Sequence, residues 1–182
     1  VGIVDKDKKL PKNILPGDKI FGFLSSGPHS NGFSLIRKIL EDISSKNSLE
    51  VKKNLLTPTK IYTKIAQNIE ILKIAKGFAH ITGGGLSNLL RLHESLGWHI
   101  DNPLEPQPEF DWISDIGSVA PVEMYRTFNM GMGMVIAVDK GHAQSITDWI
   151  SQRLPGTAIV GSVTDNGHIV THAIEGVEFS HY

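Results

Sequence analysis

The polar stretch SSGPHSNG, residues 25–32, combines several groups that can hold an anion. It contains serine hydroxyls, two glycines that let the backbone approach a ligand closely, and His29 as its ionisable side chain. An apolar run over residues 19–24 precedes it, and apolar residues recur at helical spacing after it. The first free N–H groups of a helix also favour anions, so this strand-to-helix turn is a candidate site for a phosphorylated ligand.

The stretch ITGGG, residues 81–85, is a second turn of interest. A predicted strand over residues 77–82 ends at three consecutive glycines, and leucines at helical spacing follow. Such a run is costly in chain entropy, so we expect a close approach to a phosphate or to another backbone segment. The loop lacks the Gly-Lys-Ser/Thr ending of a P-loop and the spacing of a dinucleotide fingerprint, and residues 131–135 also stop short of the latter.

Two further clusters of polar residues have the same potential. Thr57 and Thr59 flank Pro58, where a helix is predicted to begin, so their hydroxyls either cap that helix or hold an anion at its end. In residues 126–129, RTFN, an arginine, a hydroxyl and an amide lie next to glycines. Arg126 can hold a phosphate with two hydrogen bonds or form a surface ion pair.

A structural explanation stays open for the other candidates as well. Gly-Pro and Asn-Gly are ordinary turn dipeptides, and Ser30 is compatible with a simple N-cap. His80, at the end of its predicted strand, is either a ligand contact or a histidine satisfied within the protein.

Charge and composition exclude several classes of function. Eighteen Lys and Arg residues against 19 Asp and Glu give a net charge of −1, which leaves no field to hold nucleic acid or an acidic membrane surface. The chain has no cysteine, which excludes disulfides, zinc–thiolate sites and thiol nucleophiles. No apolar run reaches the roughly 18 residues of a membrane span, so we expect a soluble, cytoplasmic protein.

The elements that must position these residues form an alternating series. Strands are predicted over residues 1–5, 19–24, 77–82, 98–101, 132–138, 158–164 and 168–173. Helices are predicted from residue 33 to about 43, from 57 to 72, from 86, and over 110–116, 122–125 and 142–154. The turn at residues 165–167 is predicted to join the last two strands as a hairpin.

These elements predict an α/β fold of the α+β type, in which helices flank a mixed, largely antiparallel sheet. A chain of 182 residues is long enough for one domain that buries roughly 70% of its unfolded surface. The predicted helix over 57–72 buries Ile61, Ile65, Ile69 and Leu72. Residues 175–182 are expected to be a frayed tail.

Four blocks in order, SSGPHSNGFSL (25–35), TPTKIY (57–62), ITGGGL (81–86) and MYRTFNMG (124–131), closely resemble one family of enzymes. That family is aminoimidazole ribonucleotide synthetase, also called phosphoribosylformylglycinamidine cyclo-ligase. The resemblance extends from Val1 to about Ala173 and covers the C-terminal half of that enzyme. Residues 1–174 are therefore interpreted as its C-terminal substrate-cleft domain, and we expect the chain to be a piece of a longer polypeptide.

The resemblance implies ATP-dependent cyclisation of formylglycinamidine ribonucleotide to aminoimidazole ribonucleotide in de novo purine biosynthesis. ATP would phosphorylate the formyl oxygen, and the amidine nitrogen would then close the ring and expel phosphate. His29 would be the catalytic residue, since an unperturbed histidine exchanges protons near neutral pH. The implied substrate-binding residues are Ser26, Ser30, Asn31, Thr82, Gly83, Gly84, Gly85, Arg126, Thr127 and Asn129, and no metal ligand is assigned in this chain.

The resemblance also implies partners. ATP and Mg²⁺ would be held mainly by an N-terminal domain that has no counterpart among these residues, and the complete enzyme is expected to be a homodimer. We therefore expect the fragment alone to be inactive. Two alternatives remain: a non-catalytic ligand-binding or assembly module of the same fold, and a superfamily relative, such as a selenophosphate synthetase or thiamine-monophosphate kinase, that acts on another phosphate acceptor.

Overall fold

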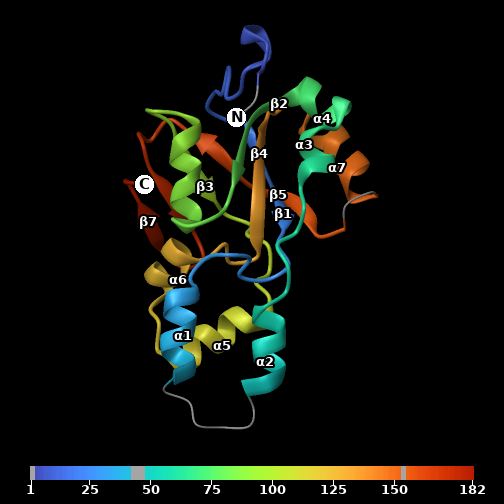
Figure 1. Ribbon diagram of the computed structural model, residues 1–182. Helices are drawn as coiled ribbons and strands as arrows, with labels where there is room; N and C mark the ends of the chain where they lie inside the picture. The colour runs from blue at the N-terminus through green and yellow to red at the C-terminus, as the bar shows by residue number, and fades with distance from the viewer. Residues whose placement is uncertain (1–2, 42–47, 153–154) are drawn as a thin grey trace.

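The computed structural model describes residues 3–41, 48–152 and 155–182 of the chain. Its centre is a seven-stranded sheet in the order β2-β4-β1-β5-β3-β6-β7 (Figure 1). The strands are β1 (Lys19–Leu24), β2 (Ala75–His80), β3 (Gly97–Ile100), β4 (Met132–Val138), β5 (Thr157–Thr164), β6 (Val170–His172) and β7 (Val177–Phe179). Among these described strands only β3 and β6 pair in parallel, which confirms the predicted mixed, largely antiparallel sheet.

Helices flank this sheet in a single domain, as predicted. The α-helices are α1 (Phe33–Glu41), α2 (Ser48–Leu55), α3 (Thr63–Ala66), α4 (Ile69–Ile74), α5 (Pro108–Gly117), α6 (Pro121–Thr127) and α7 (Ala143–Ser151). Two 3-10 helices, η1 (Lys6–Lys8) and η2 (Gly85–Leu92), complete the described elements. Within the described residues, no helix is long and apolar enough to cross a membrane.

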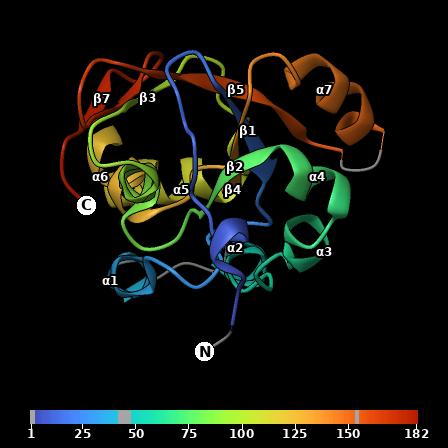
Figure 2. The same cartoon turned by 90° about the horizontal axis from the view of Figure 1, so that it is seen from above.

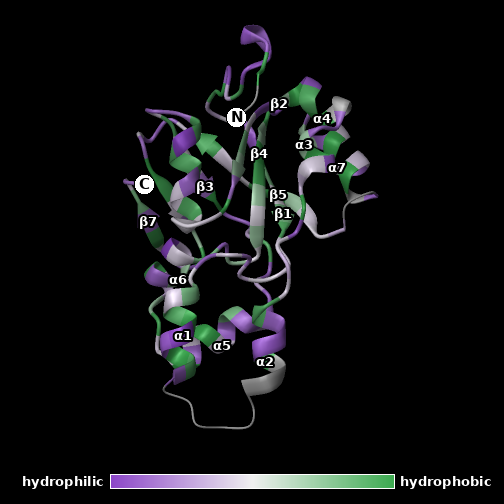
Figure 3. Cartoon of the chain, viewed as in Figure 1, coloured by the Kyte–Doolittle hydropathy of each residue, from purple (hydrophilic) through white to green (hydrophobic). Residues whose placement is uncertain are grey.

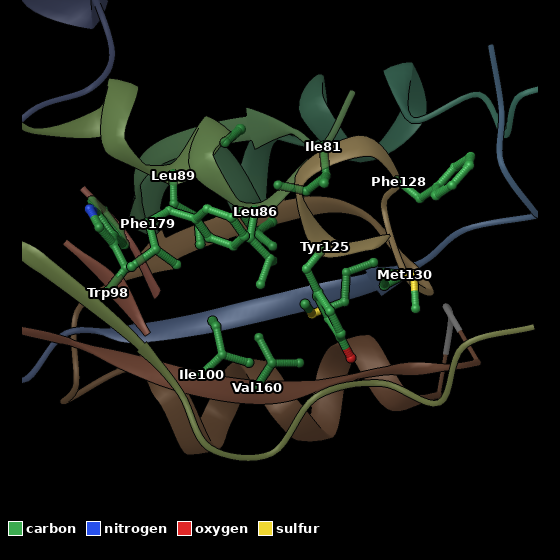
Figure 4. Packing of buried hydrophobic residues seen from close by; sticks show 14 of the residues in the cluster. Ile81, Leu86, Leu89, Trp98, Ile100, Tyr125, Phe128, Met130, Val160 and Phe179 are labelled. Carbon is green, nitrogen blue, oxygen red and sulfur yellow. The ribbon is translucent and has the colours of Figure 1, made fainter. Parts of the chain in front are cut away.

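Alternation along the central strands gives the sheet two buried faces. On β4, Val135 and Ala137 point into one hydrophobic cluster, whereas Met134 and Ile136 point into another. The first cluster includes residues of η2, α5 and α6, and the second includes residues of α3, α4 and α7. Figure 4 shows Leu86 and Leu89 of η2 and Tyr125 of α6 in the first cluster. Figure 2 shows these two groups of helices on either side of the sheet. Hydrophobic colouring accordingly concentrates along the central strands (Figure 3).

The prediction of one helix over 57–72 is wrong, because the segment contains only two short helices, α3 and α4, which are interrupted at residues 67–68. Residues 57–62 form neither helix nor strand, and α3 begins only at Thr63, with Tyr62 as its N-cap. Of the expected buried stripe, Ile65 is buried, whereas Ile61 and Leu72 are 78% and 39% exposed. The Ser26 hydroxyl donates to the Pro58 carbonyl oxygen at 2.8 Å. We infer that contacts with the first loop outweigh the local helical signal of this segment.

The predicted hairpin between the last two long strands is also wrong. β5 pairs with β1 along one edge and with β3 along the other, so no edge is free for β6. β6 instead pairs in parallel with β3. Residues 175–182, expected to fray, include β7, which pairs with β6 and buries Val177 and Phe179.

One further prediction, a strand over residues 1–5, is not confirmed, and the predicted ends of two helices are not tested. Residues 3–5 precede η1 without forming the expected strand. The predicted end of the first helix near residues 44–47 and the end of the last helix at 154 lie outside the described residues.

Candidate functional site

Three of the four sequence blocks meet at one end of the sheet because of strand topology. β1 and β2 both run antiparallel to β4, so they are parallel to each other and their C-terminal ends lie at the same end of the sheet. The loops that follow them are residues 25–32 and 81–84. β4 begins at this same end of the sheet, directly after residues 126–131. Figure 1 shows these segments between the sheet and α1, α2, α5 and α6.

The two glycine-bearing loops lie close together and are both tied to β4 or to the segment just before it. A Cβ placed on Gly83 would lie 3.3 Å from Oδ1 of Asn31. The Asn129 side-chain amide donates to the Gly27 carbonyl oxygen at 2.8 Å, which ties the first loop to the start of β4. The backbone N–H of Ile81 donates to the Gly133 carbonyl oxygen at 2.9 Å, which ties the second loop to the same strand.

The fourth block, residues 57–62, lies across the first loop. Besides the bond from Ser26 to Pro58, the Ser30 and Thr59 hydroxyl oxygens are 3.2 Å apart. The Tyr62 hydroxyl donates to the Leu24 carbonyl oxygen at 3.0 Å, where β1 ends. The four blocks, distant in sequence, therefore form one polar site.

His29 lies beneath the first loop. Its side chain is 5% exposed, and its backbone is left-handed, with φ of 58°. Its Nε2 accepts a hydrogen bond from the Ser26 backbone N–H at 3.2 Å, and its Nδ1 is buried without a partner among the described residues. The rings of Tyr62 and His80 each lie 6.2 Å from its ring, centroid to centroid. His29 is therefore enclosed rather than presented to solvent.

This environment changes the charge state expected for His29. Burial, followed by the positive charges of His80 and Lys60, lowers the pKa of His29 to about 4. The imidazole is therefore neutral at pH 7, and the bond from Ser26 leaves its proton on Nδ1. His29 was expected to exchange protons near neutral pH, but its lowered pKa moves that exchange well below neutral pH. Burial also lowers the pKa of His80 and raises that of Tyr62.

Glycine occupies each of the positions 83–85 for a different physical reason. A Cβ on Gly85 would overlap the Tyr125 carbonyl oxygen, so Gly85 is needed for packing against α6. Gly84 has φ of +97°, a left-handed conformation that favours glycine. Among the hydrogen bonds between described residues, none uses the backbone N–H of Gly83 or Gly84. These two N–H groups are available to an anionic ligand.

Asn88 supports this loop and was missed by sequence reasoning. Its side chain is 2% exposed, and its amide nitrogen donates to the carbonyl oxygens of Gly83 at 3.2 Å and Gly85 at 2.8 Å. The expected Thr82 lies half-buried beside them, and its carbonyl oxygen accepts from the Gly85 backbone N–H at 2.9 Å. A polar residue on the buried stripe of a helix was the available signal for Asn88.

The three candidates from residues 126–129 have separate environments. Arg126 is exposed, 3.8 Å from the Glu123 carboxylate, and lines a cavity of about 360 Å³ together with Gly84. The Thr127 hydroxyl donates to Glu123 at 2.8 Å. Asn129 is 1% exposed, and its Oδ1 accepts from the Gly131 backbone N–H at 3.1 Å. With both amide atoms bonded inside the protein, Asn129 positions the first loop.

The last residues of the chain reach the second loop. The Tyr182 hydroxyl donates to the Gly83 carbonyl oxygen at 3.4 Å, and the Arg91 guanidinium lies 3.4 Å from the Tyr182 ring centroid. Tyr62 and Tyr182 are therefore two aromatic neighbours of the site that the sequence did not assign to it.

The donor set of this site suits phosphoryl oxygens. Backbone N–H groups, hydroxyls and the Asn31 amide are donors without negative charge, and Lys60 adds a positive charge close enough to act on His29. No group of three or more His, Cys, Asp or Glu side chains that could hold a metal ion occurs within the described residues. The donor chemistry of these residues is thus compatible with phosphoryl oxygens as ligands.

Comparison with known families agrees with the four blocks. The model of the family described as AIR synthase related protein, C-terminal domain, matches residues 16–174. This chain belongs to that family. It is 40% identical over 177 residues to the phosphoribosylformylglycinamidine cyclo-ligase of Methanopyrus kandleri, a match that covers 94% of this chain and 51% of the relative. A cyclo-ligase of Nitrosococcus oceani is 41% identical over 175 residues, with 90% and 48% covered.

The chain spans about half the length of the curated relatives it matches. Its fold also occurs in solved structures of low sequence identity. The hydrogenase maturation protein HypE of E. coli has a TM-score of 0.62 at 19% identity, covering 93% of this chain and 50% of HypE. PurL of T. maritima, complexed with AMPPCP, has a TM-score of 0.52 at 18% identity, covering 97% of this chain and 27% of PurL.

Proposed function

We propose that this chain forms one wall of a site in which formylglycinamidine ribonucleotide is cyclised to aminoimidazole ribonucleotide, with ATP, in purine biosynthesis. The observation that carries the proposal is the convergence of the four blocks into one polar site. The names of relatives about 40% identical to the chain supply the reaction.

The chain's own groups would act on the phosphoryl oxygens. When bound, ATP supplies the phosphoryl group that turns the formyl oxygen into a leaving group, so that the amidine nitrogen can close the ring and release phosphate. The N–H groups of Gly83 and Gly84 and the hydroxyls of Ser30 and Thr59 would bind the charged oxygens, with Arg126 at the edge. Such preorganised donors stabilise the charge that develops during transfer.

His29 has a positioning role in this proposal. Its Nε2 holds the Ser26 N–H, so the ring fixes the conformation of the first loop. A neutral imidazole with a pKa of about 4 is a poor general acid at pH 7. The substrate contacts would instead come from Ser26, Ser30 and Asn31 on that loop.

The rest of the site would belong to an N-terminal domain. That domain would hold most of the ATP and the magnesium ion, and the complete enzyme would act in the cytoplasm as a homodimer. The proposal is supported by the share of its relatives that this chain spans, about one half, and by the complex of the PurL neighbour with AMPPCP. The chain alone would then be inactive.

The experiment is to assay aminoimidazole ribonucleotide formation by the chain alone and by the chain joined to the N-terminal half of a cyclo-ligase relative. We expect turnover only from the combination. In the active combination, Asn31→Ala should lower kcat/KM by roughly tenfold or more through loss of a hydrogen bond to a charged group. Asn166→Ala, at an exposed turn, is the matched control. Robust activity of the chain alone, or equal effects of the two substitutions, would contradict the proposal.

A further inference from the structure

The three residues after β7, residues 180–182, form a C-terminal segment that reaches the second loop. β7 anchors this segment, because β7 pairs with β6 and buries Phe179 in the first hydrophobic cluster. Figure 4 shows Phe179 near Leu89 of η2. The position of the C-terminal segment is therefore set by a strand in a part of the chain that was expected to fray.

The second loop needs restraint because of its composition. Glycine has the greatest backbone freedom, so holding residues 83–85 in one conformation is costly in entropy. The Ser87 hydroxyl donates to the Gly84 carbonyl oxygen at 2.7 Å, and the Asn88 side-chain amide donates to the Gly83 carbonyl oxygen at 3.2 Å. Both contacts are local in sequence. A contact from a distant segment would restrain the loop from a second direction.

Tyr182 makes such a contact. Its hydroxyl donates to the Gly83 carbonyl oxygen at 3.4 Å, and a Cβ placed on Gly84 would lie 3.0 Å from Cε2 of Tyr182. The ring therefore covers the side of Gly84 that a side chain would occupy. Because 3.4 Å is long for a bond between two oxygens, packing of the ring contributes more than its hydroxyl.

Arg91 restrains the Tyr182 ring. Tyr182 is 60% exposed, so its ring has few neighbours that fix its rotamer. The Arg91 guanidinium lies 3.4 Å from the centroid of this ring, and a cation over an aromatic face is attracted to it. Arg91 belongs to η2, which begins at Gly85 directly after the loop. The loop, η2 and the C-terminal segment thus form one closed set of contacts.

The C-terminal segment also borders the space beside the loop. The cavity of about 360 Å³ that Gly84 and Arg126 line has residues 178–182 in its wall. The Arg126 guanidinium lies 5.9 Å from the Phe179 ring centroid, so this candidate phosphate-binding group is near the same segment. A ligand in this cavity would therefore lie next to both the loop and the C-terminal segment.

We propose that the C-terminal segment holds Gly83 and Gly84 in the conformation that binds phosphoryl oxygens, with Tyr182 as a positioning residue and Arg91 as its support. Donors that are fixed before the ligand arrives bind it without the cost of ordering the loop. Tyr182 acts through the backbone of the two glycines. The inference rests on the proposed function for the identity of the ligand, and on the contacts above for the restraint.

The first test is hydrogen exchange of the chain, followed by NMR. The Ser87 backbone N–H donates to the Gly84 carbonyl oxygen at 3.1 Å, so its exchange rate reports opening of the loop. Tyr182→Ala should raise this rate by roughly fivefold or more, through loss of the ring contacts with Gly84 and Arg91. Tyr182→Phe, which keeps the ring, should exchange like the unmodified chain.

Two controls accompany this measurement. His181→Ala changes the exposed neighbouring position of the same segment and should leave the Ser87 exchange rate unchanged. The Ile81 backbone N–H, which donates to Gly133 of β4, should exchange at the same rate in every variant. Together they separate the loop from the segment and from the sheet.

The second test uses the active combination of the chain with the N-terminal half of a cyclo-ligase relative. Tyr182→Ala should lower kcat/KM for ATP by roughly fivefold or more, and Tyr182→Phe should restore it. The urea midpoint of Tyr182→Ala should stay close to that of the unmodified chain, since the side chain is largely exposed. A role in stability alone would not give this pattern.

Three results would overturn the proposal: an unchanged Ser87 exchange rate in Tyr182→Ala, equal effects of Tyr182→Ala and His181→Ala, or a loss of kcat/KM that Tyr182→Phe does not restore. Exchange is measured on the chain without turnover. An inactive combination would therefore contradict the cyclisation proposal, while the exchange rates would still decide whether Tyr182 holds the loop.

Discussion

At the scale of single residues, the glycine run at positions 83–85 combines backbone packing, a left-handed backbone conformation and a proposed ligand contact. The three glycines of the second loop look equivalent in the sequence, but Gly85 is required by the Tyr125 carbonyl and Gly84 by its left-handed backbone. Gly83 does not have a positive φ, and a Cβ placed on it would meet only the Asn31 side chain, at 3.3 Å. The fold therefore explains Gly84 and Gly85, and in the proposed function Gly83 is a glycine because a ligand approaches its backbone.

The substitutions Gly85→Ala and Gly83→Ala distinguish the structural role of Gly85 from the proposed ligand-binding role of Gly83. We expect Gly85→Ala to lower the free energy of unfolding by at least about 2 kcal/mol, because its Cβ would overlap fixed backbone at positive φ. Gly83→Ala should change stability little and weaken binding of nucleotide phosphates by the complete protein. Urea unfolding and nucleotide titration measure the two effects, and a strongly destabilised Gly83→Ala variant would contradict this assignment.

The depressed pKa of His29 predicts a dependence of stability on pH. Between its unfolded pKa of 6.5 and its folded pKa of about 4, the unfolded state binds more protons. Stability must therefore rise with pH across this window and fall as pH drops through it. We expect His29 to contribute about 2 kcal/mol to the loss of stability between pH 7 and pH 4.5.

His29→Asn tests this contribution, because asparagine tolerates the left-handed backbone while removing the titrating ring. The change in the free energy of unfolding from pH 7 to pH 4.5 should be smaller in His29→Asn than in the unmodified chain. His181→Asn, at an exposed position, is the control. An unchanged pH dependence in His29→Asn would show that His29 is not the source.

At the scale of elements, the end of the sheet opposite the site is held by charge. Lys76 on β2 donates to Asp18 at 2.8 Å, just before β1, and to Asp139 at 3.1 Å, just after β4. Asp18 is 2% exposed. Although burial opposes it, hydrogen bonds to the two aspartates raise the pKa of Lys76. These ion pairs link β1, β2 and β4 at the end of the sheet that is remote from the loops.

Lys76→Met should destabilise the protein by about 3 kcal/mol or more, because it leaves the buried Asp18 carboxylate without its partner. Asp139→Asn should have a much smaller effect, since the Asp139 side chain is 43% exposed and screened by solvent. Urea unfolding at neutral pH measures both variants. Similar losses in the two would mean that burial of Asp18 does not set the cost.

At the scale of the whole molecule, two hydrophobic clusters share one sheet. Because alternate residues of β4 enter each cluster, neither face can lose its packing without affecting the other. Trp98 lies in the first cluster with Trp112 packed against it, and Trp149 packs against the second. The three tryptophans therefore report on both faces.

We expect both faces to unfold in one cooperative transition. In a Trp149→Phe variant, and separately in a Trp98→Phe/Trp112→Phe variant, the urea midpoint from fluorescence should coincide with that from circular dichroism. An earlier fluorescence transition in either variant would reveal a face that opens independently.

The sequence by itself determined the fold class, most strands and the order of the functional blocks. A continuous apolar run such as residues 132–138 predicts a buried strand from its own residues, and this run is β4. Glycine-rich turns likewise mark the breaks between elements. These signals are local, and they survive without knowledge of contacts. The family resemblance rested on such local blocks and was confirmed by the match over residues 16–174.

Only the tertiary structure decided the features that depend on distant partners. Residues 57–62 are not helical and contact the first loop through Pro58. β6 pairs with β3 because both edges of β5 are occupied, and residues 177–179 complete the sheet. The charge state of His29 likewise depends on burial beneath residues from other segments. A single sequence records propensities within a few residues, whereas edge pairing, burial and pKa are set by groups that only the folded chain brings together.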